Sequence, residues 1–160
     1  RFEIDVYPFS QDRAIMRAAL PENAPVLTAP PEITVLREVT DDPAYKNRQL
    51  ANISCTLACT HGRYYAYTGD YEKAEQAFLQ SVQYGHTAVS VAPKHPYGYL
   101  VLSECCLALG KFFLDQGRQQ EAAEILKESL SQIRTAESYA GNTNRHFQSI
   151  QEELLRYLRK

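Results

Sequence analysis

Through most of the chain, apolar residues recur every three or four positions, the spacing that places them on one face of an α-helix. Glycine or proline interrupts this pattern at four places: Gly69, the pair Pro93 and Pro96, Gly117, and Gly141. Because glycine and proline end helices, the interruptions predict five helices joined by short connections. The predicted helices span about 44–67, 71–91, 97–115, 119–139 and 143–159.

The predicted helices differ in how much of their circumference is apolar. The stretch 119–139 has one apolar face with charged residues opposite, whereas 97–115 is apolar on nearly every side. A helix that is apolar all round is buried on several sides. We therefore expect 97–115 in the middle of the helical stack, and 143–159, which carries a single apolar stripe, as a capping helix.

The first 43 residues follow a different pattern. They hold six of the eight prolines: Pro8, Pro21, Pro25, Pro30, Pro31 and Pro43. Proline lacks a backbone donor and restricts the residue before it, so long helices are not expected here. The sequence therefore predicts two parts, an irregular, proline-rich N-terminal arm over 1–43 and a helical domain over 44–160.

Short elements are also predicted within the arm. Apolar and polar residues alternate over 2–6, which indicates an extended segment. Ser10 is a suitable helix N-cap, and the apolar spacing that follows it predicts a short helix through Leu20. Residues 33–39 fit a strand and a helix equally well.

Within the helical region, one set of residues repeats without a gap at a distance of 48 positions. Gly62, Tyr65, Gly69, Ala74, Phe78 and Ser81 correspond to Gly110, Phe113, Gly117, Ala122, Leu126 and Ser129. A glycine where two helices cross lets them approach closely, and a large residue beside it fills the remaining space. The repeat therefore predicts two consecutive antiparallel helix hairpins that stack on each other.

The segments GRYYAYTGDYEKAEQAF (62–78) and GKFFLDQGRQQEAAEIL (110–126) resemble the tetratricopeptide repeat. The resemblance implies an all-α fold in which antiparallel hairpins form a short tetratricopeptide-like solenoid. The chain departs from the family pattern in two respects. It has no tryptophan, so Ala58 and Cys106 stand where the family has one, and its repeat is 48 residues long instead of about 34.

A second, looser likeness concerns one subfamily. The stretch 83–117 looks like the linking stretch in the C-terminal helical domain of SET–MYND lysine methyltransferases. No zinc-binding cysteine array or catalytic SET segment occurs in the sequence, so the likeness implies no methyltransferase activity.

Composition and charge restrict the kinds of partner. The formal net charge of −2 is too small to hold nucleic acid or an anionic membrane surface. No uninterrupted apolar run reaches the roughly 20 residues of a membrane span. Four cysteines, Cys55, Cys59, Cys105 and Cys106, fit neither a disulfide framework nor a zinc motif. We interpret them as core residues of a protein in the reducing cytoplasm.

The sequence contains none of the common catalytic or nucleotide-binding motifs. Its four histidines are scattered, without a carboxylate or nucleophile at a motif spacing. We therefore expect no enzyme activity, no catalytic residue, no metal and no cofactor.

The resemblance implies that the first helix of each hairpin lines a concave surface. The residues expected on that surface for peptide or partner binding are Thr56, Thr60, Arg63, Tyr67, Glu104 and Lys111, with Ala108 and Asp115 beside them. Family members that hold an acidic C-terminal tail use asparagines where this chain has Thr60 and Ala108. Binding of a chaperone EEVD tail is therefore disfavoured, and Arg63, Tyr67 and Lys111 remain as the anchor for a peptide.

Tyrosines form a second set of candidates, because tyrosine is favoured at protein interfaces. The further interface candidates are Tyr64, Tyr84, Tyr97 and Tyr99.

Three functional hypotheses follow. The first is a non-catalytic scaffold or adaptor that binds a peptide segment or a partner subunit on its concave or tyrosine-rich surface. The second is a helical accessory domain of a larger enzyme, such as one of the SET–MYND type. The third is a ligand-sensing regulator. Self-association of the chain stays open.

Overall fold

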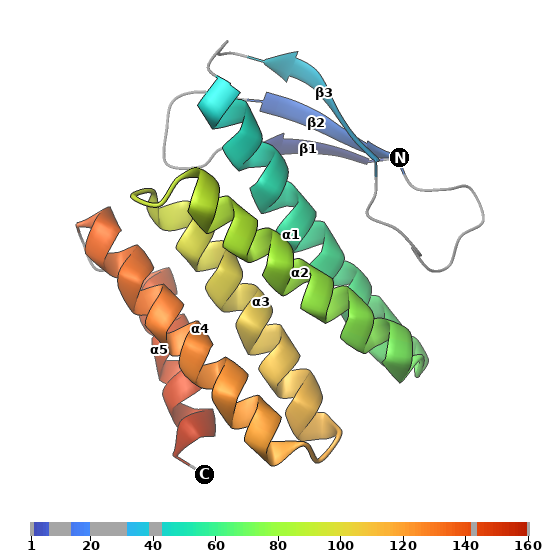
Figure 1. Ribbon diagram of the computed structural model, residues 1–160, viewed down its shortest axis with the longest axis vertical. Coiled ribbons are helices and arrows are strands. Elements are labelled where there is room, and N and C mark those ends of the chain that lie inside the picture. Colours follow the sequence, from blue (N-terminus) through green and yellow to red (C-terminus); the bar gives the residue numbers. More distant parts are fainter. Residues whose placement is uncertain (1, 7–13, 20–31, 39–42, 142–143, 160) are drawn as a thin grey trace.

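In a computed structural model, the described residues are 2–6, 14–19, 32–38, 43–141 and 144–159, with side chains from residue 47 onward. Five helices follow one another in the described part of the chain (Figure 1). They are α1 (Pro43–Thr68), α2 (Tyr71–Val91), α3 (Pro96–Asp115), α4 (Gln119–Ala140) and α5 (Arg145–Leu158). The predicted helices and their turns are therefore confirmed, with ends that differ by at most two residues.

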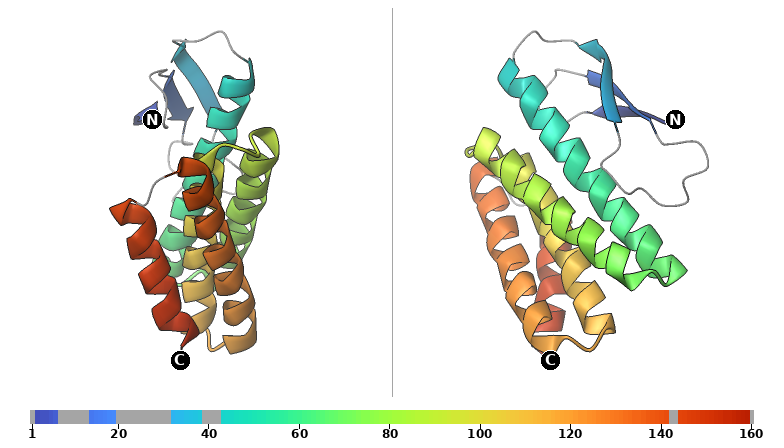
Figure 2. Two further views of the ribbon diagram at one scale, coloured as in Figure 1. Left: turned by 90° about the vertical axis from the view of Figure 1, so that its left-hand side faces the viewer. Right: turned by 45° about the vertical axis from the view of Figure 1, so that its right-hand side comes forward.

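The helices form two antiparallel hairpins, α1 with α2 and α3 with α4, which lie side by side (Figure 1). Helix α5 packs mainly against α4 and more lightly against α3. Figure 2 (left) shows α2 and α5 on opposite sides of the helical body. The all-α, tetratricopeptide-like stack predicted for this region is confirmed.

Helix α3 is the central helix, because it contacts both helices of the first hairpin as well as α4 and α5. Its length and hydropathy also meet the criteria for a membrane span, but 72% of its apolar window is buried inside the protein. Burial of this kind is typical of the core helix of a folded domain. The predicted central position of 97–115 is confirmed.

Close helix crossings hold each hairpin together at equivalent positions. A Cβ atom at Gly62 would lie 2.6 Å from Cδ1 of Phe78, and one at Gly110 would lie 2.5 Å from Cδ2 of Leu126. Both distances are well below an ordinary van der Waals contact, so only glycine fits without a shift of the opposing side chain. The structure therefore agrees with the role predicted for the two glycines, which is to let the helices of each hairpin approach closely.

The turns of the two hairpins are also equivalent. Gly69 and Gly117 have positive φ angles of 85° and 74°, which glycine adopts without the penalty of a side chain. The backbone N–H of the next residue bonds to a carbonyl five positions earlier, from Asp70 to Tyr65 and from Arg118 to Phe113, at 3.0 and 2.9 Å. This is the Schellman ending of a helix.

Arg118 joins the two hairpins at these turns. Its guanidinium donates to Glu75 of α2 at 2.6 and 2.9 Å, and it also bonds Glu121 at the start of α4. The same group lies over the ring of Phe113, 4.3 Å from the centroid. The first and second repeats are thus connected by a bidentate ion pair between Arg118 and Glu75 as well as by apolar contacts.

The N-terminal region differs from the expected irregular arm, and that prediction is wrong for the residues described there. Strands β1 (Phe2–Val6), β2 (Ala14–Ala19) and β3 (Glu32–Glu38) form an antiparallel sheet in the order β1-β2-β3. The extended segment at 2–6 is confirmed, and β3 settles the ambiguity over 33–38, whereas residue 39 lies outside the described residues.

The short helix expected between Ser10 and Leu20 is wrong over 14–19, which form the central strand of this sheet. Pairing with neighbours on both sides satisfies the backbone of this strand and overrides its local helical spacing. The remaining residues of that predicted helix lie outside the described residues, and the division of the chain at residue 43 stays a prediction.

Gly62→Ala is expected to lower the free energy of unfolding by about 1–2 kcal/mol, because overpacking against Phe78 outweighs the gain of about 1 kcal/mol in helix propensity. Urea denaturation followed by circular dichroism measures the change. Thr60→Ala, on the exposed side of the same helix, is the control and should leave stability nearly unchanged. A stabilised Gly62→Ala protein would show that this crossing is not tight.

Candidate functional site

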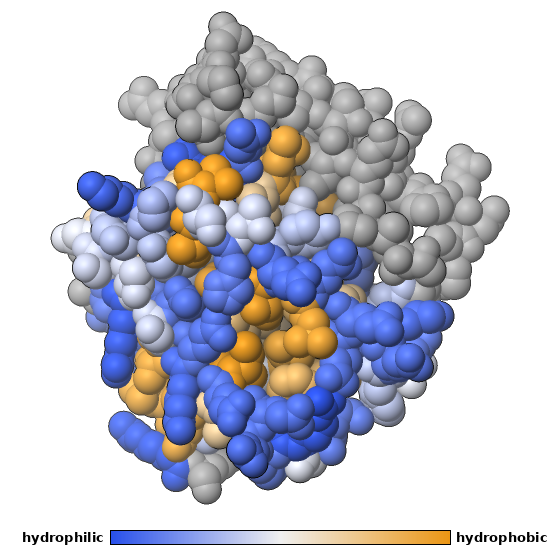
Figure 3. All heavy atoms as spheres, in the orientation of Figure 1, coloured by the Kyte–Doolittle hydropathy of each residue, from blue (hydrophilic) through white to orange (hydrophobic). Residues whose placement is uncertain are grey.

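Helices α1, α3 and α5 surround a hollow of about 570 Å³, which we call the inner hollow. Helices α2 and α4 lie toward the opposite face, which is drawn in Figure 3. That face is largely polar, with apolar side chains reaching the surface in its middle. The first helix of each hairpin and the last helix therefore all contribute to the inner hollow.

The floor of the inner hollow is apolar. It is formed by Ala66, Phe78, Leu107, Ala108, Phe112 and Ile150. The rings of Phe78 and Phe112 lie 5.4 Å apart between centroids, so α2 and α3 are joined directly beneath the hollow. A buried aromatic pair gives this floor a fixed shape.

The rim of the inner hollow is charged, and much of its charge is already paired. Lys111 of α3 forms an ion pair with Glu153 of α5, and its ammonium lies 5.7 Å from the centroid of the Tyr157 ring. His146 Nε2 lies 2.8 Å from Oε1 of Glu104. These two contacts connect α3 to α5 across the rim.

Arg63 and Asp115 complete the charged rim, and neither has an ion-pair partner among the residues that the structure describes. Arg63 is exposed on α1, and Asp115 is exposed at the end of α3. Because a charge without a partner can form a new pair at little cost, Arg63 is the cation of the hollow best suited to a carboxylate of a bound molecule.

The structure brings together three of the six residues predicted to bind a partner: Arg63, Glu104 and Lys111 line the inner hollow. Thr56 and Thr60 are exposed, but their hydroxyls donate to carbonyls of their own helix at 3.2 and 3.0 Å. They do not line the hollow.

The tyrosine candidates are spread over the surface. Tyr67 is 90% exposed and Tyr64 is 42% exposed, so both are accessible to a partner, although neither lines the inner hollow. Tyr84 accepts a hydrogen bond from Gln80, and the Tyr99 hydroxyl donates to the carbonyl of Pro93 at 2.7 Å. Tyr97 is partly buried, and that burial raises its pKa.

Sequence reasoning missed the contribution of α5. His146, Ile150 and Glu153 line the inner hollow, whereas the sequence predicted only a capping helix at this position. Their spacing of four and three residues places them on one face, a signal that was present in the sequence. What the sequence lacked was the orientation of that face toward α3.

The four cysteines lie in the core, as interpreted from the sequence. Burial raises the pKa of the Cys106 thiol, and contact with another thiol and burial together raise those of Cys59 and Cys105. Within the described part of the chain, no group of three or more His, Cys, Asp or Glu residues is arranged to hold a metal ion.

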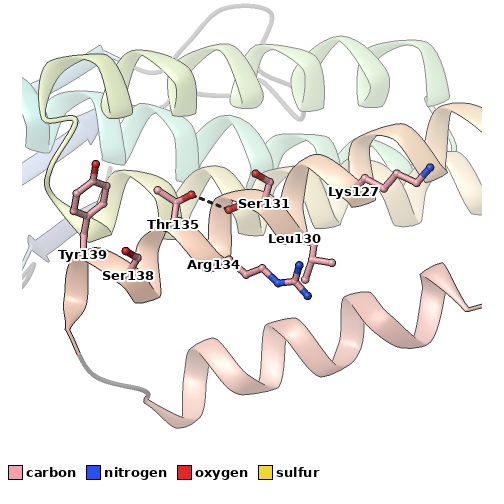
Figure 4. Close-up of a pocket in the computed structure, with 7 residues that line it drawn as sticks. All are labelled: Lys127, Leu130, Ser131, Arg134, Thr135, Ser138 and Tyr139. Atoms are coloured by element: carbon pink, nitrogen blue, oxygen red, sulfur yellow. Dashed lines mark hydrogen bonds between the residues drawn. The ribbon is translucent and has the colours of Figure 1, made fainter.

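A second hollow of about 480 Å³ is lined by residues of α4 (Figure 4). Its lining combines two cations, Lys127 and Arg134, with the hydroxyl groups of Ser131, Thr135, Ser138 and Tyr139 and with Leu130. The Thr135 hydroxyl donates to the Ser131 carbonyl at 2.9 Å, so that group is already satisfied within the helix. This surface comes from a single helix and is open to solvent.

Comparison with known proteins agrees with the geometry. The family model of the tetratricopeptide repeat matches residues 56–84, which cover the crossing and the turn of the first hairpin. No curated protein matches the chain significantly. The second hairpin repeats the close crossing and the Schellman turn of the first. Proteins built from such repeats generally mediate protein–protein interactions and are typically non-catalytic. The chain is therefore a tetratricopeptide-like helical repeat protein.

Proposed function

We propose that this protein is a non-catalytic scaffold or adaptor that binds a peptide segment of another protein in the inner hollow. The supporting observation is an apolar floor enclosed by three helices and bordered by charged side chains. A hollow of this volume accommodates several side chains, and a repeat stack offers an extended surface beside it.

The charges of the rim favour one kind of peptide. Lys111 and His146 already face Glu153 and Glu104, which leaves Arg63 as the cation available to a new partner. The carboxylates of the rim would repel a strongly acidic tail. The peptide that fits best carries apolar side chains for the floor and a single acidic residue close to them, within reach of Arg63.

The other hypotheses stay predictions. A SET segment in the full-length gene product would favour an accessory domain of a SET–MYND-type enzyme, whereas further hairpins would favour the scaffold. A thermal-shift screen with small molecules tests the ligand-sensing regulator. We also propose that the protein is cytoplasmic and that it can self-associate. The tyrosines proposed to contribute to an interface are Tyr64, Tyr67, Tyr84, Tyr97 and Tyr99.

Arg63→Glu is expected to weaken peptide binding roughly tenfold, because the acidic residue of the peptide would then face a like charge. Peptides are first selected on the wild-type protein from a displayed library of linear sequences. Their dissociation constants are then measured by fluorescence anisotropy with wild-type and variant protein.

Arg134→Glu is the matched control for this experiment, since Arg134 is an exposed arginine on α4 that does not line the inner hollow. It changes the net charge equally and should leave the affinity unchanged. Equal affinity of wild type and Arg63→Glu, or equal losses in both variants, would contradict binding in the inner hollow.

Glu153→Lys is expected to loosen the attachment of α5 by about 0.5–1 kcal/mol, because it replaces an ion pair by two like charges. Amide hydrogen exchange measures the change as faster exchange within α5. The double variant Lys111→Glu/Glu153→Lys restores opposite charges and should return exchange toward the wild-type rate.

Glu152→Lys is the control, since Glu152 is exposed on the same helix and does not line the hollow. If Glu152→Lys and Glu153→Lys accelerate exchange alike, the ion pair does not hold α5 in place.

A further inference from the structure

Two buried thiols from different hairpins lie in direct contact. The Sγ atoms of Cys55 on α1 and Cys105 on α3 are 3.1 Å apart, and both side chains are almost completely buried. Each thiol also approaches a carbonyl of the opposite helix: Cys55 Sγ lies 3.9 Å from the Val101 oxygen, and Cys105 Sγ lies 3.7 Å from the Cys55 oxygen. The two sulfurs are therefore held at the crossing of α1 and α3.

Comparison of the two hairpins shows that this contact is not part of the repeat. The residue equivalent to Cys55 in the second hairpin is Ser103, which exchanges hydrogen bonds with Ser129 of α4 at 2.9 and 2.7 Å. In the first hairpin, Ser81 occupies the position of Ser129 but donates to the Phe78 carbonyl of its own helix. The thiol of Cys55 contacts α3 of the neighbouring hairpin instead.

We propose that Cys55 and Cys105 are an oxidant-sensitive dithiol that forms an intramolecular disulfide between the two hairpins when a peroxide is present. A disulfide has an S–S distance of about 2.0 Å, so the sulfurs approach by about 1 Å. The bond joins the two helices that form walls of the inner hollow, and its formation does not depend on peptide binding.

The chemistry balances with hydrogen peroxide as the oxidant. One thiolate attacks a peroxide oxygen, the O–O bond breaks, and the resulting hydroxide takes up the thiol proton to leave as water, giving a sulfenic acid. The second sulfur attacks the sulfenic sulfur, the S–O bond breaks, and a second water leaves with the remaining thiol proton. The two thiols are oxidised, and the peroxide is reduced to two water molecules.

The rate of disulfide formation depends on the access of peroxide to the two buried thiols. Contact with Cys55 and burial raise the pKa of Cys105, so little of it is thiolate at neutral pH in the closed protein. Reaction therefore proceeds when the crossing opens locally and completes when it closes again, which brings the sulfurs together. A reducing compartment keeps both thiols reduced until peroxide is supplied.

The test treats the full chain with hydrogen peroxide at a urea concentration that leaves its circular dichroism spectrum native. Peptide mapping by mass spectrometry without reduction then identifies the products. The expected product is a Cys55–Cys105 disulfide with loss of two of the four free thiols. Four remaining thiols, a Cys59–Cys105 or intermolecular disulfide, or only sulfinic acids would overturn the proposal.

Three single variants identify the pair. Cys55→Ala and Cys105→Ala should each abolish the disulfide. Cys106→Ala removes an equally buried thiol outside the Cys55–Cys105 contact and should leave the disulfide intact. Loss of the disulfide in a natively folded Cys106→Ala protein would contradict the assignment.

A second measurement does not depend on the variants. The oxidised wild-type protein is expected to melt at least about 5 °C above the reduced protein, because the disulfide restricts the unfolded chain. An unchanged or lower Tm for protein carrying the mapped disulfide would show that the bond strains the native crossing, which would contradict its formation in the native geometry.

Discussion

The close approach of two helices at a glycine is the constraint on which the rest of the structure depends. Gly62 lies under the ring of Phe78, and Gly110 lies under the side chain of Leu126, at distances that leave no room for a Cβ atom. Because each hairpin closes at the equivalent glycine, the two hairpins share the same crossing and turn and stack side by side. The stack in turn places α1, α3 and α5 around one hollow.

Ion pairs add to the apolar contacts that hold the helices together. Arg118 connects the hairpins through Glu75, and Lys111 and Glu104 attach α5 through Glu153 and His146. The second set of pairs occupies Lys111 and His146 at the rim of the hollow and leaves Arg63 without an ion-pair partner among the described residues. Under the proposed function, a peptide partner is selected by the apolar floor and by Arg63 more than by a strongly charged surface.

The sequence predicted the helices well because glycine and proline mark every boundary, and the 48-residue repeat predicted how they pair. It did not predict β2, since the spacing of 14–19 is locally helical and only pairing with β1 and β3 makes it a strand. The lining of the inner hollow was predicted only in part, because the repeat register does not extend to α5. Arg63, Glu104 and Lys111 follow from the repeat register, whereas His146 and Glu153 belong to a helix outside the repeat.

The contact between Cys55 and Cys105 was beyond prediction from the sequence, because it joins residues 50 positions apart on helices of different hairpins. Repeat register assigns a residue to a face of its own hairpin, but it does not give the rotation of one hairpin against the next. The same limit applies to the face that α5 presents to α3. Contacts between the repeats therefore cannot be predicted from the local sequence pattern of each repeat.

Nuclear Overhauser effects measure the approach of the helices at the two crossings. Close packing of both hairpins predicts strong contacts from the Gly62 Hα protons to the Phe78 ring and, equivalently, from the Gly110 Hα protons to the Leu126 methyl groups. Detection of both sets would establish two hairpins closed in the same way. Absence of either set in a folded sample, or contacts of these glycines to other side chains, would contradict the stacked-hairpin structure.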